Sequence, residues 1–204
     1  MRPDRIISLN VVRPFRRITG GDRPPVVRGP APARRLPVLM YHSISDEPET
    51  GVDPYYRVCT GPQRFREQMQ WLRDLGCRGV TLGEGLAWLN AAGQQPPSAP
   101  GTPAPATGRP PAAENQLTPV AITFDDGFRD FYTEAFPALQ RHGFTATMFL
   151  PTAFIGDDRR RFQPSTLNPQ LATVRECLTW TEVGELRRAG MEFGSHTVNH
   201  PRLV

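Results

Sequence analysis

Five short apolar runs, separated by segments with helical spacing, set the fold that this chain can adopt. They are residues 36–41, 79–82, 119–124, 144–150 and 191–195. Runs of this length between turn-forming residues are typical of strands buried on both faces. Strands that alternate with helices form parallel sheets with right-handed crossovers, and a closed barrel of this class needs about eight strands. We therefore expect an α/β fold, either a partial, distorted (β/α) barrel or an open sheet, with about five strands present.

The segments between these runs carry helix signals. They are residues 62–75, 84–90, 131–142 and 179–188. Thr179 and Glu182 have the spacing of a capping box, which predicts a helix beginning at this point. Pro137 lies inside the third segment, where it either kinks the helix or marks a new first turn.

Two tracts are expected to contribute nothing to the core. Residues 1–34 are rich in Arg, Pro and Gly and lack a sustained apolar period, which predicts a disordered basic extension. Residues 94–116 contain seven prolines between Pro96 and Pro111, which predicts an insertion loop. The folded domain should therefore comprise residues 35–204.

The basic residues exclude some functions. All 24 of them are arginines, and the absence of lysine excludes Schiff-base catalysis and a phosphate-loop lysine. A basic N-terminal arm could contact nucleic acid or an anionic membrane, but it lacks the interleaved aromatic residues of a stacking platform. We expect no nucleic-acid partner.

The N-terminus and the cysteines bear on the compartment. The apolar run 6–12 is interrupted by Ser8 and Asn10, so we expect neither a secretory signal nor a transmembrane segment. This predicts a cytoplasmic protein, or an extracytoplasmic one if the start codon is misplaced. The three cysteines are odd in number and widely spaced, which indicates neither a disulfide framework nor a zinc ribbon.

Two polar clusters follow predicted strands directly. Asp125-Asp126-Gly127 follows one strand, and the segment from His196 to His200 follows another. The carboxyl ends of parallel strands share one face, so the clusters should be neighbours. Two imidazoles and one carboxylate make a three-ligand set with an open position for water, as in a catalytic metal site, and the second carboxylate is free to act as a base. Either cluster alone could be a turn or a helix cap, but their joint occurrence favours the metal site.

At these clusters the chain resembles the polysaccharide deacetylases that share the NodB homology domain, which are metal-dependent carbohydrate esterases of the family 4 type. Residues 123–127, Thr-Phe-Asp-Asp-Gly, resemble that family's first motif, and residues 196–200, His-Thr-Val-Asn-His, resemble its second. Residues 37–44, Pro-Val-Leu-Met-Tyr-His-Ser-Ile, resemble the opening strand of a branch that includes poly-N-acetylglucosamine deacetylases. The resemblance implies that residues 35–204 are the N-terminal portion of a NodB-type barrel.

The resemblance also implies roles for individual residues. Asp126, His196 and His200 would hold a divalent metal, zinc in the first place, with cobalt, nickel or manganese as alternatives. Asp125 would be the general base, and Thr197 would steady the histidine loop. The expected substrate is an N-acetylated polysaccharide or oligosaccharide, and the products are acetate and a free amine on the sugar.

Family members continue beyond the second motif to an arginine and proline motif, an aspartate and tryptophan motif, and a late histidine. These have no place before Val204, so we expect a truncated domain. Two other hypotheses follow: a catalytically incomplete remnant or glycan-binding module of the same fold, and an amidohydrolase that acts on a small amide.

Two other histidines and one run of arginines are further candidates for a functional role. His42 follows the first strand, so it lies either near the substrate or in a structural hydrogen bond to backbone. His142 precedes Gly143 at a predicted helix end, which favours a structural role. The arginines at 159–161 follow two aspartates and are interpreted as a solvated loop.

Overall fold

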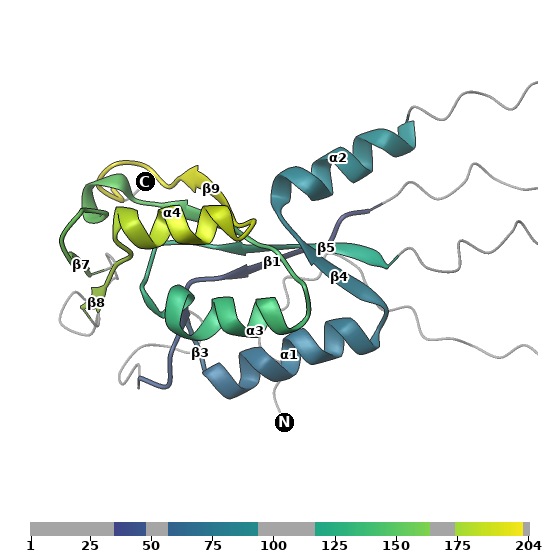
Figure 1. Ribbon diagram of the computed structural model, residues 1–204, viewed down its shortest axis with the longest axis horizontal. Helices are drawn as coiled ribbons and strands as arrows, with labels where there is room; N and C mark the ends of the chain where they lie inside the picture. Colours follow the sequence, from purple (N-terminus) through teal and green to yellow (C-terminus); the bar gives the residue numbers. More distant parts are fainter. Residues whose placement is uncertain (1–34, 48–56, 94–116, 164–173, 202–204) are drawn as a thin grey trace, which may run out of the picture.

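The computed structural model describes residues 35–47, 57–93, 117–163 and 174–201 (Figure 1). The predicted basic extension, 1–34, and the predicted insertion loop, 94–116, lie outside the described residues. The described part is an α/β arrangement in which helices pack against one parallel sheet.

The main sheet has five strands, all parallel. They are β1 (Val38–Tyr41), β4 (Cys77–Val80), β5 (Thr118–Phe124), β6 (Thr147–Leu150) and β9 (Glu192–Ser195). Their order is β1-β5-β6-β9, and β4 also pairs with β5. The predicted parallel sheet of about five strands is confirmed, and β5 lies at its centre.

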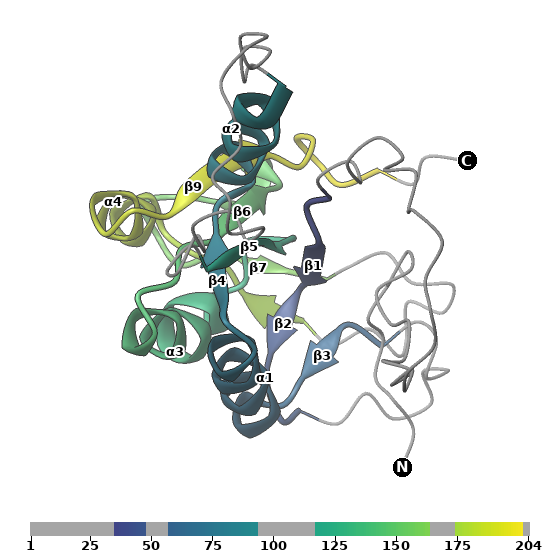
Figure 2. The ribbon, with the colours of Figure 1, turned by 90° about the vertical axis from the view of Figure 1, so that its right-hand side faces the viewer.

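Four α-helices accompany the sheet in the described residues. They are α1 (Pro62–Asp74), α2 (Leu82–Gly93), α3 (Phe136–Arg141) and α4 (Trp180–Arg188). A π-helical turn, η1 (Phe131–Ala135), leads into α3, and a 3-10 turn, η2 (Thr152–Phe154), follows β6. Figure 2 shows α1, α3 and α4 along one side of the sheet and α2 apart from them.

Aromatic rings fill the core between the sheet and the helices. The Phe124 ring on β5 lies 5.8 Å from Phe65 of α1 and 4.7 Å from Phe131 of η1, in edge-to-face geometry. All three side chains are fully buried. Because Phe124 directly precedes Asp125, this packing also fixes the end of β5.

Some element boundaries differ from the predicted ones. The predicted strand 79–82 ends at Val80, because Thr81 and Glu84 cap the start of α2. The backbone N–H of Glu84 donates to Thr81 Oγ1 at 3.1 Å, and that of Thr81 donates to Glu84 Oε2 at 3.0 Å. Pro137 lies in the first turn of α3, the second of its two expected positions.

Two short ladders were not predicted. Strand β2 (Ser43–Ile44) pairs in parallel with β3 (Cys59–Thr60), and β7 (Arg161–Phe162) pairs antiparallel with β8 (Arg175–Glu176). Each strand has two residues, which is too short for any periodicity to show in the sequence.

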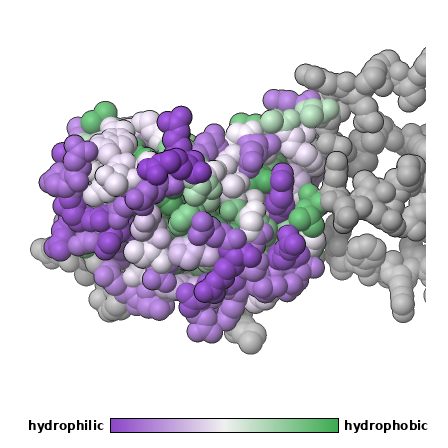
Figure 3. All heavy atoms as spheres, viewed as in Figure 1, coloured by the Kyte–Doolittle hydropathy of each residue, from purple (hydrophilic) through white to green (hydrophobic). Residues whose placement is uncertain are grey.

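The view in Figure 3 shows mostly hydrophilic residues at the surface, with apolar residues over α2. Leu86 of α2 is 47% exposed. Among the described residues, no helix combines the length and the apolar character needed to cross a membrane.

The arginine run after η2 is only partly solvated. Arg159 forms a two-pronged ion pair with Glu182 of α4, at 2.6 and 2.7 Å, and donates to the Cys177 carbonyl at 2.8 Å. Arg161 is 68% exposed and lies 3.6 Å from Glu176. The interpretation as a solvated loop therefore holds for Arg161 but is wrong for Arg159, which attaches the loop to α4.

Replacing Glu182 with glutamine should destabilise the fold by about 3 kcal/mol at neutral pH, because Arg159 loses the nearer of its two carboxylate partners. Burial alone would raise the pKa of the Glu182 carboxyl, but hydrogen bonds from Arg159 and the Thr179 backbone lower it to about 2. A lowered pKa means that the stabilisation is complete above the ordinary value of 4.5 and is lost as the pH falls toward about 2.

Urea unfolding of the original protein and of Glu182→Gln, measured between pH 7 and pH 2, checks this prediction. The difference between their unfolding free energies should shrink as the pH falls through that range. Glu67→Gln, at an exposed position on α1, is the matched control and should change little. A constant difference across the pH range would contradict the assignment.

Candidate metal centre

Both polar clusters lie at the carboxyl edge of the sheet, as the parallel order requires. Asp125 follows β5, and its backbone N–H donates to the Tyr41 carbonyl at the end of β1, at 3.0 Å. His196 follows β9, and its N–H donates to the Leu150 carbonyl at the end of β6, at 2.8 Å. Strand β6 lies between β5 and β9, so the two clusters face each other across one strand.

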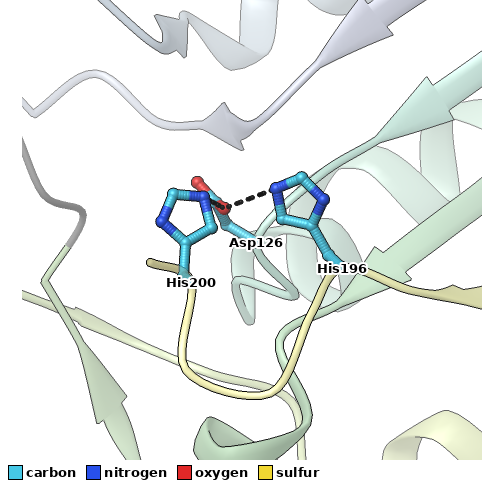
Figure 4. Close-up of side chains that lie close together, drawn as sticks. All are labelled: Asp126, His196 and His200. Atoms are coloured by element: carbon cyan, nitrogen blue, oxygen red, sulfur yellow. Dashed lines mark ion pairs between the residues drawn. The ribbon is translucent and has the colours of Figure 1, made fainter. Parts of the chain in front are cut away.

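Asp126, His196 and His200 converge on one point (Figure 4). The Asp126 Oδ1 atom lies 3.7 Å from His196 Nε2 and 3.3 Å from His200 Nε2. One potential ligand atom from each residue lies within 4.8 Å of the other two. Ligand atoms placed about 2.1 Å from one tetrahedral ion are about 3.4 Å apart. The set is therefore close to the spacing that a bound divalent ion needs.

The Asp126 carboxylate has the environment of a metal ligand. Its side chain is only 2% exposed, and its Oδ1 atom is buried without a hydrogen-bond partner among the described residues. Burial raises the pKa of this carboxyl, and the facing histidines oppose that effect. A buried oxygen without a donor is costly unless a cation satisfies it. The histidine side chains are 32% and 27% exposed, so the group can be reached from solvent.

Hydrogen bonds within the histidine loop and to η2 fix its shape. The Thr197 Oγ1 atom accepts from the backbone N–H of His200 at 2.9 Å. The Thr197 carbonyl accepts from the N–H of Thr152 at 3.2 Å, and the Val198 carbonyl accepts from that of Ala153 at 3.0 Å. Thr197 is therefore bonded within the loop through its side chain and to η2 through its carbonyl, and its loop-steadying role stays a prediction.

The backbone at the site is strained. Within the described residues, Asp126, Thr197 and His200 are the non-glycine residues with positive φ, at 71°, 66° and 49°. Each such conformation costs about 1–2 kcal/mol. Strain of this kind concentrated at one group of side chains is typical of functional sites.

His42 also reaches this site. Its Nε2 atom lies 3.8 Å from Asp125 Oδ2, and the two side chains are 24% and 14% exposed. This places His42 beside the expected base, and its position near the substrate stays a prediction. His142 lies elsewhere, at the C-cap of α3, with its ring 5.5 Å from that of Phe144.

Two neighbours of the site were not found from the sequence. The buried Phe162 ring of β7 lies 5.3 Å from the His200 ring. The Ser43 hydroxyl donates to Asp130 Oδ2, which ties β2 to the turn after Asp126. Both contacts join distant segments, and no local pattern marks the residues involved. Only the position of Ser43, directly after His42, is a signal.

Comparisons with known proteins agree with this geometry. The family model described as polysaccharide deacetylase matches residues 113–204, which contain both polar clusters. The chain is 29% identical over 169 residues to protein YxkH of Bacillus subtilis (strain 168). Over residues 113–204 the chain is therefore similar to the polysaccharide deacetylase family. Members of this family are generally metal-dependent.

The curated relatives give the extent of the similarity. The match to YxkH covers 83% of this chain and 44% of that protein. The Escherichia coli (strain K12) protein named poly-beta-1,6-N-acetyl-D-glucosamine N-deacetylase is 28% identical over 171 residues, which are 83% of this chain and 22% of that protein. The chain thus spans less than half the length of these curated relatives.

Solved structures show the same fold. Streptococcus pyogenes deacetylase PplD, in complex with acetate, superposes with a TM-score of 0.53 at 26% identity, over 81% of this chain and 57% of that one. IcaB from Ammonifex degensii superposes with a TM-score of 0.54 at 22% identity, over 80% of this chain and 53% of that one. The sheet described above is therefore the NodB-type deacetylase arrangement, as a partial barrel.

Proposed function

We propose that the protein is a metal-dependent hydrolase that removes N-acetyl groups from an amino-sugar polymer. The observation that carries this proposal is the convergence of Asp126, His196 and His200 beside Asp125. Two imidazole nitrogens and one carboxylate oxygen are the ligand types that zinc accepts in catalytic sites, and cobalt, nickel or manganese can occupy the same set.

Asp126, His196 and His200 would hold the ion. A divalent metal in this position lowers the pKa of a bound water and polarises the acetyl carbonyl. Asp126 is the buried anchor of the set, and the two histidines approach it from the solvent side.

Asp125 is the general base in this proposal. It neighbours Asp126 in sequence, yet its carboxylate is more exposed, at 14% against 2%. A carboxylate beside the ligand set can take a proton from the attacking water as the oxygen bonds to the acetyl carbon. The C–N bond then breaks, which yields acetate and a sugar amine.

The leaving nitrogen needs a proton, and we assign its delivery to His42. Its Nε2 lies 3.8 Å from Asp125 Oδ2, so an acid and a base can contact the same acetamido group. In the described residues the other histidines are the two proposed ligands and His142, whose ring packs beside Phe144.

The substrate class rests on the relatives. An E. coli relative carries the name of a poly-beta-1,6-N-acetyl-D-glucosamine N-deacetylase. We therefore propose a β-linked N-acetylglucosamine polymer, with the β-1,6 linkage as first candidate. An N-acetylated sugar also suits a site with a carbonyl-polarising ion and two proton-handling side chains.

Acetate release tests the proposal. The chain is loaded with one equivalent of Zn²⁺ and incubated with β-1,6-linked and β-1,4-linked N-acetylglucosamine oligomers, and with a small aryl acetamide. We expect acetate from the β-1,6 oligomer, none after chelation, and recovery when Zn²⁺ is restored. Oligomer binding without acetate would favour a glycan-binding module instead, and hydrolysis of the small amide alone would favour an amidohydrolase.

A further inference from the structure

We propose that Asp130 is a positioning residue that holds His42 in place against Asp125, acting through Ser43. The inference deepens the proposed function, because it rests on the assignment of His42 to the site. It concerns a carboxylate that the proposed mechanism does not use.

The turn 125–130 is bonded to the chain on both sides of His42. Before His42, the Tyr41 carbonyl accepts from the backbone N–H of Asp125 at 3.0 Å. After His42, the Ser43 hydroxyl donates to Asp130 Oδ2. One short turn thus supplies both the proposed base and the two attachments that flank the proposed acid.

The usual reason for an aspartate at this position does not apply. Asp130 is the N-cap residue of η1, yet its side chain makes no capping hydrogen bond to that helix. The carboxylate is directed across to β2 instead. An aspartate that caps its own helix would leave β2 unattached at this point, so the observed contacts indicate a long-range role.

The ladder that contains Ser43 is weak without Asp130. Strand β2 has two residues and pairs with the two residues of β3. Ser43 and Ile44 are nevertheless 0% exposed. A two-residue ladder fixes little backbone by itself, so the bond from Ser43 to Asp130 should contribute much of the order of the segment after His42.

Arg175 supports the charged form of Asp130. It is 7% exposed, and its guanidinium lies 5.6 Å from the centre of the Phe128 ring. Burial raises the pKa of the Asp130 carboxyl, and the hydrogen bond from Ser43 and the charge of Arg175 oppose that effect. The Ser43 hydroxyl and the Arg175 charge therefore both favour the carboxylate that accepts the bond.

The test observes His42 directly. The protein contains four histidines, so the imidazole ¹H–¹⁵N resonances of the full chain, loaded with Zn²⁺ at one fixed pH, can be assigned by substitution. We expect Asp130→Ala and Ser43→Ala to move the His42 ring resonances and to leave those of His142 in place. Asp130→Asn, which keeps an acceptor oxygen, should move them less than Asp130→Ala.

Kinetics add a second readout. Asp130→Ala should lower kcat for acetate release about 10- to 100-fold, as expected for a displaced catalytic group. Its affinity for Zn²⁺ should stay within about threefold of that of the original protein, because the substitution touches no metal ligand. Asp74→Ala, on the exposed last turn of α1, is the matched control and should change none of these properties.

The outcomes separate the two proposals. If the His42 resonances are unchanged in both Asp130→Ala and Ser43→Ala, the positioning role is overturned. If Asp130→Ala does not fold, Ser43→Ala decides alone, since it removes one hydroxyl. Failure of the proposed function would appear differently, as an original protein that binds Zn²⁺ and releases no acetate from any oligomer, whatever the resonances do.

Discussion

Replacing His200 with alanine is expected to weaken Zn²⁺ binding by more than about 100-fold. Loss of a residue that only hydrogen-bonds to a metal ligand lowers metal affinity about 10- to 100-fold, and loss of a ligand itself should lower it further. His200 Nε2 lies 3.3 Å from Asp126 Oδ1, the shorter of the two histidine approaches. Removing it leaves one imidazole and one carboxylate, which are too few to hold the ion against water.

Isothermal titration with Zn²⁺ measures this, and thermal unfolding supplies an independent readout. A ligand at 100 times its dissociation constant stabilises the folded state by about 2.7 kcal/mol. The original protein should therefore unfold at higher temperature with Zn²⁺ than with chelator, and His200→Ala should show no such difference. His142→Ala is the control, since its ring packs beside Phe144 and takes no part in the site. Unchanged stoichiometry and affinity in His200→Ala would reject the ligand set.

The sequence predicted the sheet well because the apolar runs match its strands. β5, whose six residues from Pro119 to Phe124 are all buried, is the strongest example. Buried strands in parallel order must deliver their carboxyl ends to one edge. That rule is sufficient to bring Asp126 and the histidine loop together without knowledge of any side-chain contact.

Where the sequence failed, the deciding hydrogen bonds and ion pairs were ones that the apolar pattern does not show. The end of β4 was misplaced because Thr81 caps α2 together with Glu84, whereas the run 79–82 has the composition of a strand throughout. Arg159 looked like part of a solvated run, because its partner Glu182 lies 23 positions away. Positive φ at Thr197 and His200 likewise depends on the loop being bonded to η2.

Replacing Asp125 with asparagine is expected to lower kcat for acetate release by about 10² to 10⁴, the usual contribution of a general base, while Zn²⁺ binding is retained. An asparagine side chain has nearly the same size but cannot take the proton from water. The fold should tolerate the change, because the bond from residue 125 to Tyr41 uses the backbone N–H and not the side chain.

Substitution of the neighbouring residue, Asp126, should affect metal binding as well as activity, which distinguishes its role from that of Asp125. Asp126→Asn should lose Zn²⁺ affinity as well as activity, because its buried Oδ1 faces both histidines. Asp158→Asn, at a side chain that is 81% exposed, is the matched control and should alter neither property. Two adjacent carboxylates can differ this much because Asp126 adopts a φ of 71°, which turns its side chain into the protein while that of Asp125 stays toward His42. If Asp125→Asn loses the metal and Asp126→Asn keeps it, the two roles are exchanged and the proposed mechanism is wrong.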